Sequence, residues 1–128
     1  MKINIPASIG ELLDKITILE IKKNKIKESK KLIEINKELK LLNNIVKIKK
    51  LKNANISKLK NQLKKINIKL WNVEDRLRVI EGIKIFDSNF VKNARSVYKL
   101  NDKRSSIKSK INILTKSNIN EVKSYESY

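Results

Sequence analysis

The stretch that decides the fold is residues 55–81, which run NISKLKNQLKKINIKLWNVEDRLRVIE. Its apolar residues recur at alternating steps of three and four, a spacing that places them on one side of an α-helix. They are Ile56, Leu59, Leu63, Ile66, Leu70, Val73, Leu77 and Ile80. The pattern predicts one long amphipathic helix over 55–81, and we expect Gly82 to end it.

The stretch before it repeats this rhythm. Residues 30–50 carry Leu32, Ile35, Leu39, Leu42 and Val46 at the same steps, which predicts a second helix there. The region 53–55 is the expected turn between the two helices. We expect the two to pair as a long antiparallel helical hairpin.

Two further helices are indicated by their capping residues. Ser8 is followed three residues later by Glu11, a capping box that predicts a helix over 9–27. Asp87 is suited to cap a fourth helix over 88–115.

The fold class follows from these four segments. The chain has only two glycines and one proline, so it has little of the turn chemistry that a β-sandwich or a doubly wound sheet needs. We predict an all-α antiparallel bundle of about four helices that forms a single domain over 1–128. Residues 116–128 show no periodicity and are expected to form a tail, docked through Tyr125.

Composition excludes several kinds of chemistry. The chain has no cysteine and no histidine, which removes disulfides, thiolate metal sites, cysteine nucleophiles and the commonest general base. No glycine-rich phosphate loop is present, and we expect no cofactor. Residues 1–10 lack the features of a secretory signal, and no segment reaches the about 18 to 20 apolar residues of a membrane span. A cytoplasmic location is therefore expected.

The net charge of +18 raises the question of nucleic-acid binding. Residues 30–70 hold most of the excess, because thirteen lysines there face only Glu34 and Glu38. This stretch contains neither arginine nor an aromatic residue, whereas sites for phosphates and bases favour arginine forks and interleaved aromatics. A solvated lysine face is the favoured interpretation, and nucleic-acid binding remains an alternative.

A functional site is better placed in residues 71–104, where residue types other than lysine, asparagine and isoleucine gather. On the helix over 55–81, one face carries Trp71, Glu74, Arg78 and Glu81 at steps of three, four and three. On the helix over 88–115, Arg95, Tyr98 and Asp102 share one face, and Asn101, Arg104 and Lys108 share another. The alternative is a set of surface ion pairs, each contributing about 0.2 to 0.5 kcal/mol.

Arg104 interrupts the apolar stripe of its helix. A guanidinium at a core-facing position requires a carboxylate or a bound anion to offset its desolvation. We predict that Arg104 lies in or beside the core and pairs with Glu20.

Two enzyme classes are weak alternatives. Glu11 and Asp14 lie three residues apart and could hold Mg²⁺, as in helical nucleotide pyrophosphohydrolases, but the second acidic motif of that family is absent. The segment from Glu11 to Ile26 resembles all-helical chorismate mutases only loosely. We therefore predict no metal site.

Several motifs together resemble a small bacterial family of unknown function. They are SIGELLDKITILEIK at 8–22, LWNVEDRLR at 70–78, ARSVY at 94–98 followed by Asn101-Asp102, and EVKSY at 121–125. The resemblance runs nearly end to end. It implies a helical protein of about this size, encoded in some members near genes for surface-polysaccharide synthesis, and it implies no activity.

These observations predict a helical binding or interaction module. Its polar site is expected between the first, third and fourth helices, for a protein partner or a small anionic ligand, and a homodimer is possible. A small enzyme acting on a phosphorylated or carboxylated metabolite is the second alternative. The candidate ligand-binding residues are Glu11, Asp14, Lys15, Trp71, Glu74, Arg78, Arg95, Tyr98, Asn101, Asp102 and Arg104.

Overall fold

A computed structural model describes all of residues 1–128 and contains four helices. They are α1 (Ile9–Lys25), α2 (Ser29–Ile48), α3 (Ala54–Ile83) and α4 (Ser88–Leu114). The prediction of an all-α fold is confirmed, and each helix end lies within two residues of its predicted position. None of the helices has an apolar stretch long enough to traverse a lipid bilayer.

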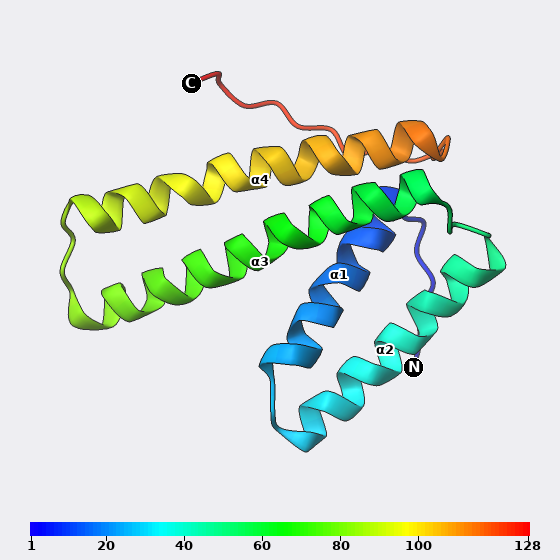
Figure 1. The fold of residues 1–128 in the computed structure, drawn as a ribbon, viewed down its shortest axis with the longest axis horizontal. Helices are drawn as coiled ribbons and strands as arrows, with labels where there is room; N and C mark the ends of the chain where they lie inside the picture. Colours follow the sequence, from blue (N-terminus) through cyan, green and yellow to red (C-terminus); the bar gives the residue numbers. More distant parts are fainter.

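The helices form two antiparallel hairpins, α1 with α2 and α3 with α4, and the first hairpin lies across one end of the second (Figure 1). The predicted pairing of residues 30–50 with residues 55–81 is therefore wrong: α2 packs on α1, and α2 and α3 diverge from the turn that joins them. Helix length explains the observed pairing. Helices of 17 and 20 residues pair with each other, as do those of 30 and 27, so each pair can bury its apolar stripes over most of their length.

The main hydrophobic core lies where the two hairpins cross. Its ten buried residues come from all four helices: Leu13, Ile16, Leu19, Ile35, Leu39, Val46, Ile56, Leu63, Ile107 and Ile111. None of them falls between Leu63 and Ile107. The remaining part of the α3–α4 hairpin, residues 71–98, therefore extends past the core as a two-helix projection, which we call the arm (Figure 1).

The predicted caps form at two helix starts. The Ser8 hydroxyl accepts a hydrogen bond from the backbone N–H of Glu11 at 3.0 Å, and Asp87 accepts one from the N–H of Phe90 at 3.1 Å. The capping box is incomplete, however, because the Glu11 carboxylate pairs with Lys108 at 2.8 Å. Glu11 is thereby available to a site between α1 and α4.

Gly82 does not end α3, contrary to the prediction. The helix continues to Ile83, and the residue that ends it is Lys84, whose φ of 55° is left-handed. Such a position more often holds glycine. Gly82 itself is an ordinary helical residue, so its lack of a side chain is not required by the backbone.

Candidate functional site

A buried polar network ties α1 to α3 and α4. The Asp14 side chain is only 1% exposed. Its Oδ1 accepts hydrogen bonds from Asn67 Nδ2 and from Arg104 Nε, each at 2.9 Å, and its Oδ2 pairs with Arg104 Nη2. Asn67 Nδ2 also donates to the Thr17 hydroxyl at 2.9 Å. Every buried side-chain polar atom thus has a partner, so the network stabilises this crossing.

Gly10 sets the register between α1 and α4. A Cβ at this position would lie 2.6 Å from the backbone oxygen of Lys108, so only glycine permits the observed approach. The Gly10 N–H donates to Asn112 Oδ1 at 2.7 Å, which holds the first turn of α1 on α4. The two helices run antiparallel here. Asp14 lies four residues after Gly10 on α1, and Arg104 lies four residues before Lys108 on α4, so Asp14 meets Arg104.

Arg104 pairs with a carboxylate, as predicted, but the predicted partner, Glu20, is wrong. Its side chain is 27% exposed and paired with a carboxylate, but that carboxylate belongs to Asp14. Hydrogen bonding to Asp14 raises the pKa of Arg104 against the opposing effect of burial. Glu20 instead pairs with Lys60 and Lys64, each at 3.0 Å. Burial alone would raise the pKa of Glu20, but the hydrogen bonds from these two lysines outweigh it and lower that pKa.

A small polar cleft adjoins this network at Arg104, and Lys108 forms part of its wall. The Lys108 side chain is only 7% exposed, yet its ammonium contacts two carboxylates, Glu11 at 2.8 Å and Glu121 at 2.9 Å. The cleft measures about 220 Å³ and has no apolar lining residue. Its walls are Glu11, Asn101, Arg104, Ser105, Lys108, Glu121 and Lys123. We call it the Lys108 cleft.

The ionisation of the Lys108 cleft depends on its ion pairs. Burial favours a lower pKa for Lys108, but the hydrogen bonds with Glu11 and Glu121 outweigh it and raise that pKa. The hydrogen bond from Lys108 lowers the pKa of Glu121. Both partners are therefore charged throughout the neutral pH range.

The C-terminal tail brings Glu121 to the cleft. Residues after Leu114 have no helix, and they run back along α4 (Figure 1). The Tyr128 hydroxyl donates to Asp102 Oδ2, and the Tyr128 ring packs edge-on against Tyr98 with 5.3 Å between centroids. The tail is thus docked, but Tyr125, its predicted anchor, is 77% exposed. It lines a second pocket of about 480 Å³, shared between the tail and α4.

The structure brings together about half of the predicted site residues. Glu11, Asn101 and Arg104 line the Lys108 cleft, and Asp14 lies beneath it. Tyr98 and Asp102 line the adjoining tail pocket, together with Val97, Asn101, Lys123, Tyr125, Glu126 and Tyr128.

The other predicted residues lie elsewhere, so the expectation of a single concave site for the whole set is wrong. Lys15 points toward α2, where it pairs with Glu38 at 2.7 Å. Glu74 and Arg78 border a shallow groove on the arm, Trp71 is half-buried on α3, and Arg95 is exposed on α4. None of these residues lines the Lys108 cleft.

Sequence reasoning did not select Lys108 or Glu121 as site residues. For Lys108 a signal existed, because Asn101, Arg104 and Lys108 follow one another at steps of three and four and so share one face of α4. For Glu121 no such signal exists. It lies in an aperiodic segment, and only the path of the tail brings it to Lys108.

The chain matches a known family over its whole length. The model of a family of unknown function, DUF6165, matches residues 1–128. The chain belongs to this family. Neither the curated proteins nor the solved structures contain a match to this DUF6165 member. Membership agrees with the resemblance to a family of unknown function, and it assigns no activity to the chain.

Proposed function

We propose that this DUF6165 member is a binding module that holds the anionic group of a small ligand at Lys108, between α1, α4 and the tail. One observation carries the proposal. An ammonium with 7% of its side chain exposed is held by two carboxylates, and one of these comes from a segment without regular structure. Glu121 therefore occupies the position that a ligand's carboxylate or phosphate would take.

The two carboxylates differ in how readily they can be replaced. Glu11 lies in the first turn of α1, which Asn112 and the Ser8 cap hold in place. Glu121 lies in the tail, whose release would leave all four helices and the main core intact. An external anion can thus exchange with Glu121 while Glu11 stays in position.

Charge favours an anion once Glu121 has left. The charge of Arg104 is balanced by Asp14, and Lys108 keeps one carboxylate partner, Glu11, in place of two. The second position at the Lys108 ammonium is then open to an external anion. Because Lys108 is largely removed from water, its attraction for an anion is screened less than that of a surface lysine.

The lining of the cleft indicates the kind of ligand. It has a small volume and no apolar wall, which suits a compact ligand rich in hydroxyl or charged groups. Asn101 and Ser105 add neutral hydrogen-bonding groups beside the charged ones. Together with the link between the resembled family and surface-polysaccharide genes, this makes a phosphorylated or carboxylated sugar the ligand class that we propose.

Calorimetric titration with inorganic phosphate and with glucuronate tests the proposal, with glucose as the uncharged control. E121Q removes the competing carboxylate at constant size and should bind both anions several-fold more tightly than the wild type. K108M should remove this binding. K110M, which changes an exposed lysine of the same helix, is the matched control and should behave as the wild type. Equal affinities for K108M and K110M would refute the proposal.

A further inference from the structure

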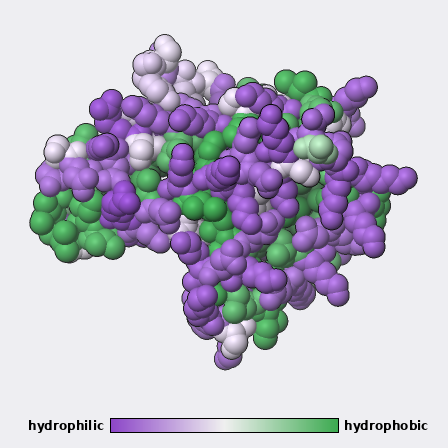
Figure 2. Space-filling model, in the orientation of Figure 1, coloured by the Kyte–Doolittle hydropathy of each residue, from purple (hydrophilic) through white to green (hydrophobic).

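The arm exposes an apolar face that nothing in the protein covers. Val79 is 65% exposed, and Ile83, one turn further along α3, is 60% exposed. The loop after α3 adds Ile85 and Phe86, each more than half exposed. Figure 2 shows apolar surface gathered at this end of the α3–α4 hairpin. Isolated apolar residues on a surface are common, but a contiguous group of them marks an interaction site.

Gly82 lies within this face and has no explanation inside the chain. Glycine is a poor helix former, although Gly82 lies in the last turn of α3 and not in its interior. At Gly10 the close approach of α4 accounts for the glycine, since a Cβ there would lie 2.6 Å from a backbone oxygen. At Gly82 a Cβ would meet nothing within 4 Å, and φ is not positive. A glycine at an exposed helical position is explained if another helix approaches closely from outside.

The spacing on α3 fits such an approach. Asn72, Asp75, Val79 and Gly82 follow one another at steps of three and four, which is the spacing of a helix–helix seam. All four residues are exposed. They lie on the opposite side of α3 from the stripe that packs on α4, so α3 carries a second seam that has no partner within one chain.

Charge indicates what the partner is. The chain carries +18, but residues 71–98 hold four acidic and five basic side chains, a net charge of only +1. Two copies of such a basic protein would repel each other at most surfaces. Contact along the arms avoids this repulsion. An arm segment of about 13 helical residues is about 20 Å long. It holds the basic ends of the two copies further apart than the Debye length at physiological salt, which is about 8 Å, so their charges are screened from each other.

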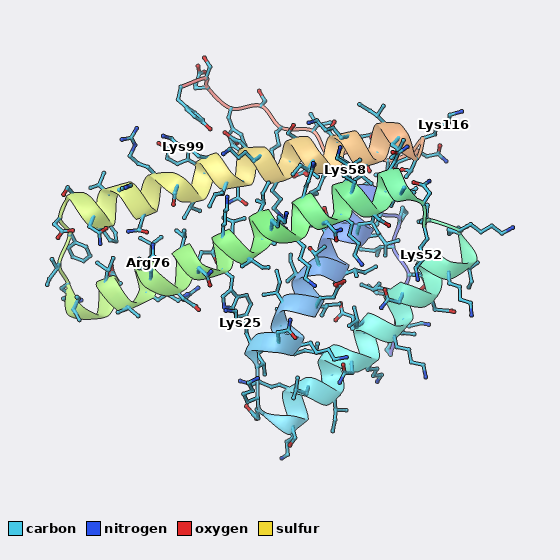
Figure 3. All side chains as sticks on the ribbon, in the orientation of Figure 1. Lys25, Lys52, Lys58, Arg76, Lys99 and Lys116 are labelled. Atoms are coloured by element: carbon cyan, nitrogen blue, oxygen red, sulfur yellow. The ribbon has the colours of Figure 1, made fainter.

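We infer that two copies of this protein pair through the α3 face of the arm, in a two-fold antiparallel arrangement around Val79 and Gly82. In this arrangement Val79 of each copy faces Gly82 of the other, so no like charges meet at the centre of the contact. The arm is stiff enough to present this face, since Arg76 crosses to α4 and donates to Asn93 Oδ1 at 3.0 Å (Figure 3). Phe86 also packs edge-on against Phe90, with 5.0 Å between centroids.

Sedimentation velocity of the full chain over a range of concentrations tests the inference. The wild type should show a concentration-dependent dimer. V79K places a charge in the seam and should raise the dissociation constant by at least about tenfold. I33K is the matched control, because Ile33 lies on α2 and is also 65% exposed, and it should leave the dimer unchanged.

G82L separates pairing from folding. Leucine is a better helix former than glycine, so the monomer should melt at a higher temperature. Its side chain blocks the close approach, so the dimer should weaken as it does in V79K. A wild type that stays monomeric at every concentration, or a dimer that V79K and G82L leave intact, would overturn the inference. Anion binding at Lys108 lies outside the arm and is unaffected by either outcome.

Discussion

Among the ion pairs of this protein, the one between Asp14 and Arg104 has the most deeply buried carboxylate. Asp14 is 1% exposed and depends on Arg104 for two of its hydrogen bonds. Arg104→Met would leave that carboxylate buried with Asn67 as its remaining side-chain partner. We expect the free energy of unfolding to fall by about 3 kcal/mol, as is typical for removing one partner of a buried pair. Urea denaturation measures this loss.

Two further variants decide whether the loss comes from the stranded acid. In D14L/R104M both charges are gone, and much of the lost stability should return. K108M should change stability by less than about 1 kcal/mol, because Glu11 and Glu121 are 50% and 36% exposed and stay hydrated. Additive losses in the double variant would show that the Asp14–Arg104 pair does not carry the energy.

The sequence could predict that Arg104 needs a carboxylate, but not which one. The prediction of Glu20 rested on its place beside the apolar stripe of α1. The choice between Glu20 and Asp14 is made by the register of α1 on α4, which depends on the close contact of Gly10 with Lys108. A glycine in the first turn of a helix gives no indication in sequence of which residue will approach it.

At the scale of elements, helix positions were predictable and helix pairing was not. The positions follow from apolar spacing and from capping residues such as Ser8 and Asp87, both of which are local. Pairing depends on which stripes bury one another, and all four stripes share the same period. The signal that could have found the pairing is helix length, since α1 matches α2 and α3 matches α4.

The tail should be released at low pH. The pKa of Glu121 is lowered by Lys108, so tail docking is fully stabilised above the ordinary glutamate value of 4.5 and loses that support as pH falls through the lowered pKa. We expect residues 119–128 to begin to detach only below the ordinary glutamate pKa of 4.5, as Glu121 takes up its proton. Amide hydrogen exchange of the tail at pH 3 to 6 measures this. E121Q is the control, and its tail should show little change over the same range.

At alkaline pH, tail docking weakens as the pH rises, because Lys108 loses its proton. The pKa of Lys108 is raised by its two carboxylates, so this contribution is complete below the ordinary lysine value of 10.5 and disappears as pH rises through the raised pKa. Tyr128 acts in the same direction, because its bond to Asp102 requires the protonated hydroxyl and raises its pKa. A tail whose exchange stays unchanged as Glu121 takes up its proton would contradict the role given to Glu121.

For the whole molecule, exposed lysines lie on every helix, although residues 30–70 hold most of the excess charge. The labelled residues Lys25, Lys58, Lys99 and Lys116 lie on α1, on α3, on α4 and after α4, and all are exposed (Figure 3). Two of the lysines in residues 30–70 have structural roles, since Lys60 and Lys64 hold Glu20. We therefore expect the lysine surface to act mainly as a solvated face.

This expectation can be measured with a random DNA duplex. Fluorescence anisotropy should show weak binding at about 50 mM salt that is largely lost by about 200 mM, because the attraction comes from counterion release. Lys108 contributes little to it, so K108M and the wild type should bind the duplex alike. Nanomolar, sequence-selective binding at physiological salt would show that the basic surface is a recognition surface.

The measurement that tests the central claim most directly is NMR of the wild-type protein during titration with glucuronate. If an external carboxylate replaces Glu121 at Lys108, the Lys108 side-chain resonances should shift. Those of residues 119–128 should move toward random-coil values over the same range of concentrations. Resonances of the arm and of α2 should stay in place. Saturation of Lys108 with the tail still docked, or release of the tail with Lys108 unchanged, would contradict the claim that Glu121 occupies the ligand's position.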